Sequence, residues 1–316
     1  MDEVTKKRIK NLQEGDRRAL SRVLSLVEEQ DDQAFEILEH LFEHTGKGMS
    51  VGITGPAGAG KSTLIDQLIR LVRKQDQKIS VLAVDPSSPF SGGAVLGDRV
   101  RMQGHCSDDG VFIRSVGSRG KSGGVSFATR ALLQILDVYG SEYTVVETVG
   151  AGQSEVDIMN LVDTTVVVLT PESGDSIQAL KAGMLEIADV FVINKKDREG
   201  ANRVAHDIEM MLSLVPSESQ WKPPIILTSA QSGEGVAQLL EALQNHRGYL
   251  NTLQVDPARL RRKRKAFLYE MIQTRLAGYV EEWIDRDPHR RKALESTDEP
   301  NLYKMVKEGI AACLKS

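Results

Sequence analysis

Residues 50–74 read "SVGITGPAGAGKSTLIDQLIRLVRK", and this stretch decides the fold class. The short apolar run at its start leads into Gly55-x4-Gly60-Lys61-Ser62, and a helical pattern follows at once. Glycines let the backbone amides close around a phosphate, and the N-terminus of the following helix adds positive potential there. Lys61 would reach the β- and γ-phosphates of a nucleoside triphosphate, and the Ser62 hydroxyl would bind Mg²⁺. The predicted phosphate loop comprises Gly55, Ala57, Gly58, Ala59, Gly60, Lys61, Ser62 and Thr63.

Short apolar runs continue along the chain and alternate with amphipathic helical patterns. They are "ISVLAVD" (79–85), "VFIRSV" (111–116), "YTVVETVG" (143–150), "TTVVVLTP" (164–171), "VFVINKKD" (190–197) and "PIILTSA" (224–230). Runs this short and this unalternated suit parallel strands buried on both faces. We therefore predict an α/β fold with a doubly wound, mostly parallel sheet that binds its ligand at the carboxyl ends of the strands.

The domain organisation follows from where the strand runs begin and stop. We expect a P-loop domain over residues 48–250, preceded by an N-terminal helical extension over 1–47 and followed by a C-terminal helical extension over 251–316. In the C-terminal part, "PARLRRKRKAFLYEMIQTRLAGYVEEWIDRD" predicts one long helix, and a shorter helix is expected around 301–314. Arg261–Lys265 is a basic run, but its helical period spreads the charges over more than one face, so we interpret it as a solvated or subunit-facing helix.

Composition limits the possible partners and the compartment. A net charge of −4 gives no overall attraction to nucleic acid or to an acidic membrane surface. The two cysteines, Cys106 and Cys313, lie far apart without a CxxC pattern, so we expect neither a disulfide framework nor a thiolate metal site. No apolar run reaches the length of a membrane span, and the charged N-terminus lacks the apolar core of a signal peptide. We expect a cytoplasmic protein that binds neither membranes nor nucleic acid.

Two strand-end motifs predict which base is bound. At 194–197 the chain carries Asn194-Lys195-Lys196-Asp197, in which the aspartate can accept hydrogen bonds from N1–H and the 2-amino group of guanine. Adenine offers neither donor, and a site built to bond such a group rejects an analogue lacking it by roughly 10⁴–10⁵. The Lys195 stem would cover the base, and Asn194 would brace the loops. The predicted nucleotide is GTP, or GDP after hydrolysis.

The second motif is Thr228-Ser229-Ala230, where a backbone amide can donate to O6 of guanine. The base-binding residues predicted from the two motifs are Asn194, Lys195, Asp197, Ser229, Ala230 and Gln231.

Acidic residues near other strand ends are candidates for the metal and the catalytic site. Asp85 follows a strand and is a candidate Mg²⁺ ligand, directly or through water. Asp98 would join the metal shell or orient the attacking water, or else cap a helix that begins nearby. Glu147 and Gly150 stand where Ras-like proteins carry DxxG, so Glu147 would hold a metal-bound water and the Gly150 amide would bond the γ-phosphate. The predicted catalytic residues are Lys61, Asp98, Glu147 and Gly150, and the predicted metal ligands are Ser62, Asp85, Asp98 and Glu147.

Four arginines in or near these stretches are candidates for neutralising transition-state charge, but a structural arginine is the simpler interpretation of each. We assign no arginine finger among Arg99, Arg101, Arg114 and Arg119.

Longer blocks of sequence carry a family resemblance. These blocks are "GITGPAGAGKSTLID", "DPSSPFSGGAVLGDRVRM", "VETVGAGQSEVDI" and "SGDSIQALKAGMLEIADVFVINKKD". Together with the helical tail they resemble the GTPase chaperones of adenosylcobalamin-dependent methylmalonyl-CoA mutase. That family belongs to the G3E group of signal-recognition-particle-like P-loop GTPases, and some members have been labelled arginine/ornithine transport system kinases.

The resemblance covers nearly the whole chain and implies a role beyond hydrolysis. It implies a homodimer formed through the C-terminal helices, and slow GTP hydrolysis that the partner mutase accelerates. It also implies gating of adenosylcobalamin delivery and protection or reactivation of the mutase. The family's third switch would correspond to residues 173–189. The alternative interpretation of this stretch is an ordinary amphipathic helix that follows a strand. The switch's candidate reporters of nucleotide state are Asp175, Gln178, Lys181 and Glu186.

Two other functions stay open at this point. A nickel- or zinc-inserting GTPase of the G3E group would use a metal-binding tract, and His40 and His44 stand four residues apart but without a third ligand. A protein kinase acting on a periplasmic amino-acid-binding transport component would need an acceptor site with a base near the γ-phosphate. The Asn194–Asp197 and Glu147–Gly150 motifs together are more typical of a switch, but the sequence alone does not exclude transfer of phosphate to a protein.

Overall fold

The computed structural model describes residues 3–29, 32–85, 103–105, 107–117, 127–148, 154–172, 187–214, 220–252, 257–296 and 300–313. The chain divides into two compact units, Met1–Val255 and Asp256–Ser316. In the described parts of the chain, none of the helices is both long enough and apolar enough to cross a membrane.

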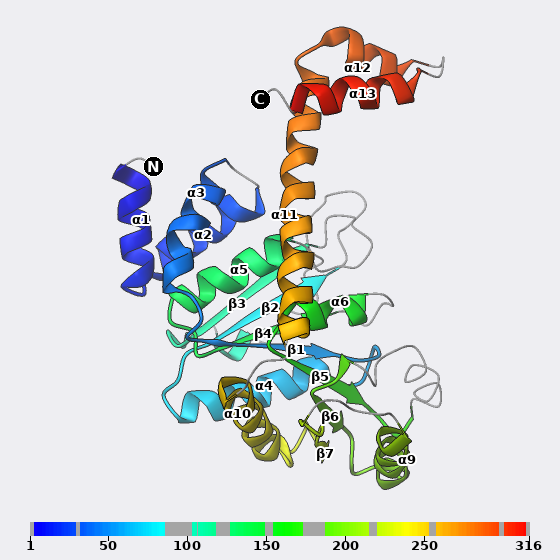
Figure 1. The fold of residues 1–316 in the computed structure, drawn as a ribbon. Coiled ribbons are helices and arrows are strands. Elements are labelled where there is room, and N and C mark those ends of the chain that lie inside the picture. Colours follow the sequence, from blue (N-terminus) through cyan, green and yellow to red (C-terminus); the bar gives the residue numbers. More distant parts are fainter. Residues whose placement is uncertain are drawn as a thin grey trace. The chain divides into compact units, whose positions relative to one another are not determined.

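A seven-stranded sheet forms the centre of the first unit (Figure 1). The strands are β1 (Met49–Thr54), β2 (Ile79–Asp85), β3 (Val111–Gly117), β4 (Tyr143–Thr148), β5 (Thr164–Leu169), β6 (Val190–Ile193) and β7 (Ile225–Leu227). Their order is β3-β2-β4-β1-β5-β6-β7, and every neighbouring pair is parallel. Each apolar run singled out in the sequence contains one strand, which confirms the predicted α/β fold. Because β1 lies between β4 and β5, the loop that follows β1 opens at the middle of the sheet.

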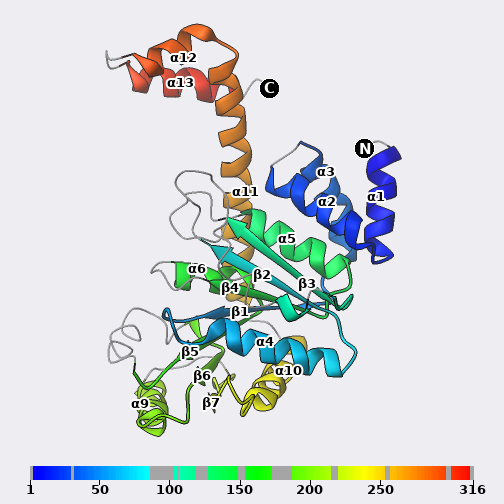
Figure 2. The ribbon, with the colours of Figure 1, turned by 180° about the vertical axis from the view of Figure 1, so that it is seen from behind.

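Helices cover both faces of the sheet (Figures 1 and 2). α4 (Lys61–Lys74) and α10 (Val236–Thr252) pack on one face, and α5 (Phe127–Val138), α6 (Ser154–Leu161) and α9 (Ala201–Leu214) on the other. Strand β5 shows the alternation that this requires: Val166 and Val168 join the cluster under α4 and α10, while Val167 and Leu169 join the one under α9. All four are fully buried, as expected for a parallel sheet between two helical layers.

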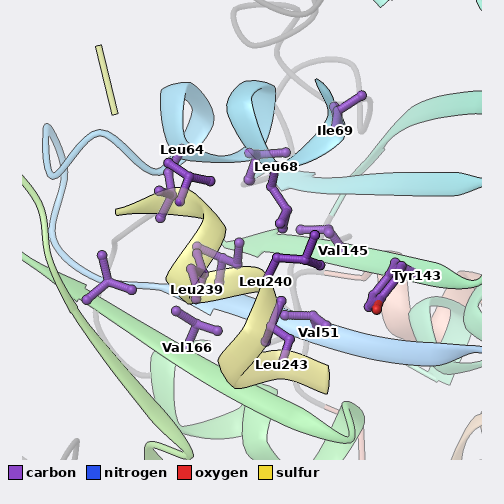
Figure 3. Packing of buried hydrophobic residues seen from close by; sticks show 14 of the residues in the cluster. Val51, Leu64, Leu68, Ile69, Tyr143, Val145, Val166, Leu239, Leu240 and Leu243 are labelled. Carbon is purple, nitrogen blue, oxygen red and sulfur yellow. The ribbon is translucent and has the colours of Figure 1, made fainter. Parts of the chain in front are cut away.

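The larger hydrophobic cluster fixes the direction of α4 (Figure 3). Leu64 and Leu68 lie one helical turn apart and meet Leu239 and Leu240 of α10 above strands β1, β4 and β5. Each of these leucines is at most 4% exposed, and burying such a side chain contributes about 1.5–3 kcal/mol. The first turn of α4 is therefore held firmly beneath the loop after β1.

The N-terminal helices α1 (Glu3–Gln13), α2 (Arg17–Glu28) and α3 (Asp32–Leu41) belong to the same unit, followed by the short 3₁₀ helix η1 (Phe42–His44). Helices α2 and α3 pack against α5. Asp16 caps α2 by accepting hydrogen bonds from the amides of Arg18 and Ala19 at 2.7 and 3.2 Å. Arg114 of β3 pairs with Glu28 of α2 and donates to Ser25 Oγ at 3.1 Å, so this arginine fastens the N-terminal helices to the sheet.

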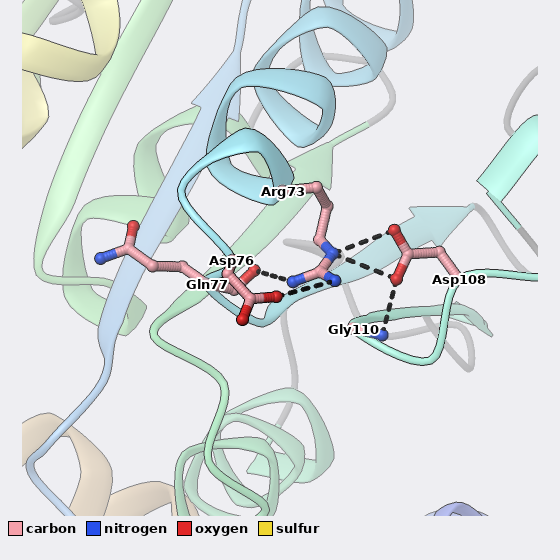
Figure 4. Close-up of polar contacts among 5 residues, drawn as sticks. All are labelled: Arg73, Asp76, Gln77, Asp108 and Gly110. Carbon is pink, nitrogen blue, oxygen red and sulfur yellow. Dashed lines mark hydrogen bonds and ion pairs between the residues drawn. The ribbon is translucent and has the colours of Figure 1, made fainter.

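A second set of ion pairs fastens α4 to the chain just before β3 (Figure 4). The Arg73 Nε donates to both carboxylate oxygens of Asp108 at 3.1 and 3.0 Å, and the Gly110 amide donates to Asp108 Oδ1 at 2.8 Å. The hydrogen bond from Arg73 holds the pKa of Asp108 below its ordinary value. Two turns earlier in α4, the Asp66 Oδ1 atom lies 2.7 Å from Nε2 of His105 in the 3₁₀ helix η2 (Gln103–His105).

The second unit consists of α11 (Pro257–Asp285), α12 (Pro288–Glu295) and α13 (Leu302–Cys313). The sequence predicted α11 and α13 but missed α12. The sequence does carry a start signal for α12, because Asp287 followed by Pro288 is a favoured helix N-terminus. In the structure Asp287 is the N-cap and accepts a hydrogen bond from the His289 amide at 2.9 Å. The Arg290 guanidinium stacks 4.0 Å from the ring of Trp283 and so packs α12 onto α11.

Candidate nucleotide-binding site

At two positions the loop between β1 and α4 combines a backbone conformation that favours glycine with neighbouring atoms that leave no room for a Cβ. Gly55 and Gly60 have φ values of 141° and 88°, which L side chains rarely adopt. A Cβ atom on Gly55 would also overlap the carbonyl oxygen of Val168 in β5, and one on Gly60 would overlap the side-chain amide of Asn194. The loop consequently lies directly against the neighbouring strand and against the loop after β6.

Lys61 places a positive charge inside this loop. Its ammonium donates to the carbonyl oxygens of Gly55 at 2.8 Å and Pro56 at 3.1 Å, and the residue is only 7% exposed. A buried ammonium is tolerated when such partners satisfy its donors. The same charge, together with the N-terminus of α4, makes the loop a site for an anion such as a phosphate.

Ser62 and Glu147 bring two oxygen ligands together at the foot of the loop. The Ser62 hydroxyl donates to Glu147 Oε1 at 2.7 Å, and the residues are 8% and 4% exposed. Ser62 lies in the first turn of α4, and Glu147 lies near the end of β4, the strand beside β1. Hydroxyl and carboxylate oxygens are the hard donors that Mg²⁺ prefers, so the pair fits the predicted metal.

Asn194 connects three loops. Its side-chain nitrogen donates to the carbonyl oxygen of Ala59 at 2.8 Å, and its side-chain oxygen accepts from Thr228 Oγ1 at 3.1 Å and from the Ala230 amide at 3.0 Å. The residue is 2% exposed, so water does not compete for these bonds. The bracing role predicted for Asn194 is therefore visible as hydrogen bonds to the phosphate loop and to the strand end after β7.

These elements surround a cavity of about 380 Å³ at the carboxyl ends of the strands. It brings together Gly58, Gly60, Lys61, Ser62, Thr63, Glu147, Asn194, Lys195, Asp197, Ser229, Ala230 and Gln231 from the sequence predictions. Three predicted residues of the same loop do not line the cavity: Gly55, Ala57 and Ala59. The predicted metal ligand Asp85 is the last residue of β2 and is not among the lining residues either.

Asp98 and Gly150 lie outside the described residues, as do Arg99, Arg101 and Arg119. The same is true of the candidate third-switch residues Asp175, Gln178, Lys181 and Glu186.

Sequence reasoning missed Arg198, which also lines the cavity. The available signal was its position directly after Asp197. A cation there lies beside a predicted base-binding carboxylate, but nothing in a single sequence distinguishes it from a solvated arginine.

The family model described as Methylmalonyl Co-A mutase-associated GTPase MeaB matches residues 20–283. The chain belongs to the MeaB family of GTPases. This finding confirms the resemblance that the longer sequence blocks indicate. As a member of this family, the chain is a GTPase that binds a guanine nucleotide.

Relatives of this MeaB-family chain match it over most of its length. A protein of Pyrococcus horikoshii that bears the name of a GTPase is 46% identical over 280 residues, which are 88% of this chain and 87% of the relative. The mitochondrial methylmalonic aciduria type A homolog of Mus musculus is 33% identical over 280 residues, covering 83% of this chain and 68% of the relative. Among solved structures, a crystal structure of an LAO/AO transport system kinase superposes with a TM-score of 0.68 and 26% identity, covering 98% of this chain and 99% of the other.

Proposed function

We propose that the cavity at the carboxyl ends of the strands is where this MeaB-family chain binds GTP and GDP. The phosphates would lie against the loop that carries Lys61, and Asp197 would accept the hydrogen bonds of the guanine edge. The observation that carries the proposal is the Asn194 hydrogen-bond network, because it joins the phosphate loop to both base-recognition motifs. A ligand that places its phosphates on this loop and offers hydrogen-bond donors to Asp197 would be a guanine nucleotide.

We propose that Mg²⁺ is held by Ser62 and Glu147, with Asp85 and Asp98 completing its protein ligands. When bound, Mg²⁺ neutralises charge on the β- and γ-phosphates. The chain's own contribution is positional. Lys61 supplies a fixed positive charge, and Glu147, held by the Ser62 hydroxyl at 2.7 Å, orients water beside the phosphates. Gly150 would donate its amide to the γ-phosphate.

The nucleotide state would be read by a cobalamin enzyme. The matching family is named for its association with methylmalonyl Co-A mutase, and the mouse relative is named for methylmalonic aciduria. We infer that the chain gates delivery of adenosylcobalamin to methylmalonyl-CoA mutase in the cytoplasm, and protects or reactivates that enzyme as a chaperone. The third-switch residues Asp175, Gln178, Lys181 and Glu186 would carry the signal.

A homodimer is supported by an apolar stripe on α11. Leu268, Ile272, Leu276 and Tyr279 recur every three or four residues, and they are 56%, 47%, 44% and 38% exposed. This spacing puts them on one face of the helix. A contiguous exposed apolar face on a long helix marks an interaction surface, and a second copy of the same helix offers a matching face.

The decisive experiment measures binding to purified methylmalonyl-CoA mutase in the presence of GDP and of a non-hydrolysable GTP analogue, with GTP turnover followed alongside. We expect association to differ between the two nucleotide states and the mutase to accelerate turnover. Lys61→Ala should lose both effects, whereas Lys74→Ala, at the exposed end of the same helix, should keep them. Equal association in both states with unchanged turnover would contradict the chaperone role.

The same reactions distinguish a switch from a kinase. With γ-labelled GTP, a switch releases the label as free phosphate. Transfer of the label to the mutase, or to an added amino-acid-binding protein, would instead support a kinase.

A further inference from the structure

Two cations of the base-recognition loop converge on one carboxylate. Glu172 follows β5, and its Oε2 atom lies 3.2 Å from the Lys195 ammonium. The guanidinium of Arg198 pairs with Oε1 of the same side chain. Both cations line the nucleotide cavity. Glu172 therefore connects the turn after β5 to the side of the base site formed by the loop after β6.

The backbone of Lys195 is fixed independently of Glu172. Its φ of 59° lies in the left-handed region, which is uncommon for a residue other than glycine. The Asn194 amide donates to the carbonyl oxygen of Leu169 at 2.8 Å, and the Lys196 amide donates to that of Thr228 at 3.0 Å. The main chain around Lys195 is therefore attached to the ends of both neighbouring strands, and the variable that remains is the direction of its long side chain.

We propose that Glu172 is a positioning residue of the nucleotide site, which holds the Lys195 side chain over the base and so slows the release of the guanine nucleotide. This inference rests on the proposed function of the cavity. With its ammonium tied to Glu172, the methylene stem of Lys195 is confined to the conformation in which it covers the base. Without that tie, the flexible side chain samples other conformations and loses that freedom only when the nucleotide binds.

An isolated surface ion pair contributes little, and the exposed fractions here are 27% for the Lys195 side chain and 46% for that of Glu172. The expected effect therefore comes from the order that the ion pair imposes on the Lys195 side chain, and not from the net free energy of the pair itself. Immobilising one flexible side chain in advance changes a binding equilibrium by about twofold to tenfold. For the loss of Glu172 we expect release to become about fivefold faster.

The test compares Glu172→Gln with Glu199→Gln. Glu199 is an exposed residue of the loop that carries Lys195 and Arg198, so its replacement removes an equal charge from that loop. Release of N-methylanthraniloyl-labelled GDP is followed by stopped-flow fluorescence after mixing with excess unlabelled GDP. We expect about fivefold faster release from Glu172→Gln and an unchanged rate for Glu199→Gln. Glu172→Asp keeps the charge but shortens its reach, and its rate should fall between those of the wild type and Glu172→Gln.

A double-mutant cycle distinguishes positioning of the Lys195 side chain from a general structural role of Glu172. In a Lys195→Met background, Glu172→Gln should have no further effect on release, because the side chain that it positions is gone. In an Arg198→Met background, Glu172→Gln should keep its full effect. Added salt should accelerate release from the wild type more than from Glu172→Gln.

The outcomes separate this inference from the proposed function. Wild-type protein that fails to bind labelled GDP would overturn both. Normal binding by the wild type with equal release rates for Glu172→Gln and Glu199→Gln would overturn the role of Glu172 alone. A full effect of Glu172→Gln in the Lys195→Met background would do the same.

Discussion

Replacing Asn194 by alanine tests whether the three loops of the site act as one unit. The substitution removes three hydrogen bonds: to the carbonyl oxygen of Ala59, from the Thr228 hydroxyl and from the Ala230 amide. Those partners are at most 3% exposed, so water cannot easily replace the lost side chain. At about 1 kcal/mol for each bond, we expect the free energy of unfolding of the nucleotide-free protein to fall by about 3 kcal/mol.

Urea denaturation of the nucleotide-free protein, followed by circular dichroism, measures this loss, and calorimetric titration with GDP measures its effect on the site. We expect GDP affinity to fall at least tenfold, because the phosphate loop and the base-binding loops are no longer fixed in position relative to one another. Asn202→Ala on the exposed side of α9 is the matched control and should leave both quantities unchanged. A destabilisation below about 1 kcal/mol, or unaltered GDP affinity in Asn194→Ala, would refute this reasoning.

Four other changes test separate parts of the molecule. Lys61→Ala should abolish tight GTP binding and turnover, as measured by calorimetry and phosphate release. Asp197→Asn should weaken GTP binding and reduce the preference for GTP over ATP; a preference that persists would contradict the assignment of guanine recognition to this carboxylate. Asp108→Asn should remove a stabilisation by Arg73 of about 0.5 kcal/mol after allowance for solvent screening. Because the folded-state pKa of Asp108 is lowered, that contribution is present at neutral pH and disappears as the pH falls below the ordinary range of an aspartate, so urea midpoints of the two proteins should converge in acid. Leu276→Glu should shift the mass in sedimentation from dimer to monomer, and an unchanged mass would exclude this stripe as the interface.

The strands and the phosphate loop were predictable because their signals are local. Central parallel strands are buried on both faces, so they are short and mostly apolar, and β4, β5 and β6 are buried along their whole length. The glycines at 55 and 60 are dictated by backbone angles that the loop imposes on its own residues. The family could be recognised for a related reason, because the motifs that carry the resemblance are contiguous stretches of sequence around these loops.

The contacts between loops were less predictable because they join residues that are distant in sequence. Asn194 and Ala59 are 135 residues apart, and Lys195 and Glu172 are 23 apart. Nothing near Glu172 in the chain indicates that a lysine will reach it; the parallel order of β5 and β6 brings the two together. Helix α12 was missed for a different reason, since it is only 8 residues long and too short to show a clear period.

The pairing of Ser62 with Glu147 has a consequence for the cation that the proposed metal site would accept. A serine hydroxyl and a carboxylate present only oxygen, a hard donor, to whatever cation approaches them. Such atoms favour ions that hold water and phosphate oxygens well, and they give no advantage to ions that prefer imidazole or thiolate. In the proposed Mg²⁺ site, these two side chains would therefore discriminate between divalent ions by their own chemistry, before the shape of the cavity contributes.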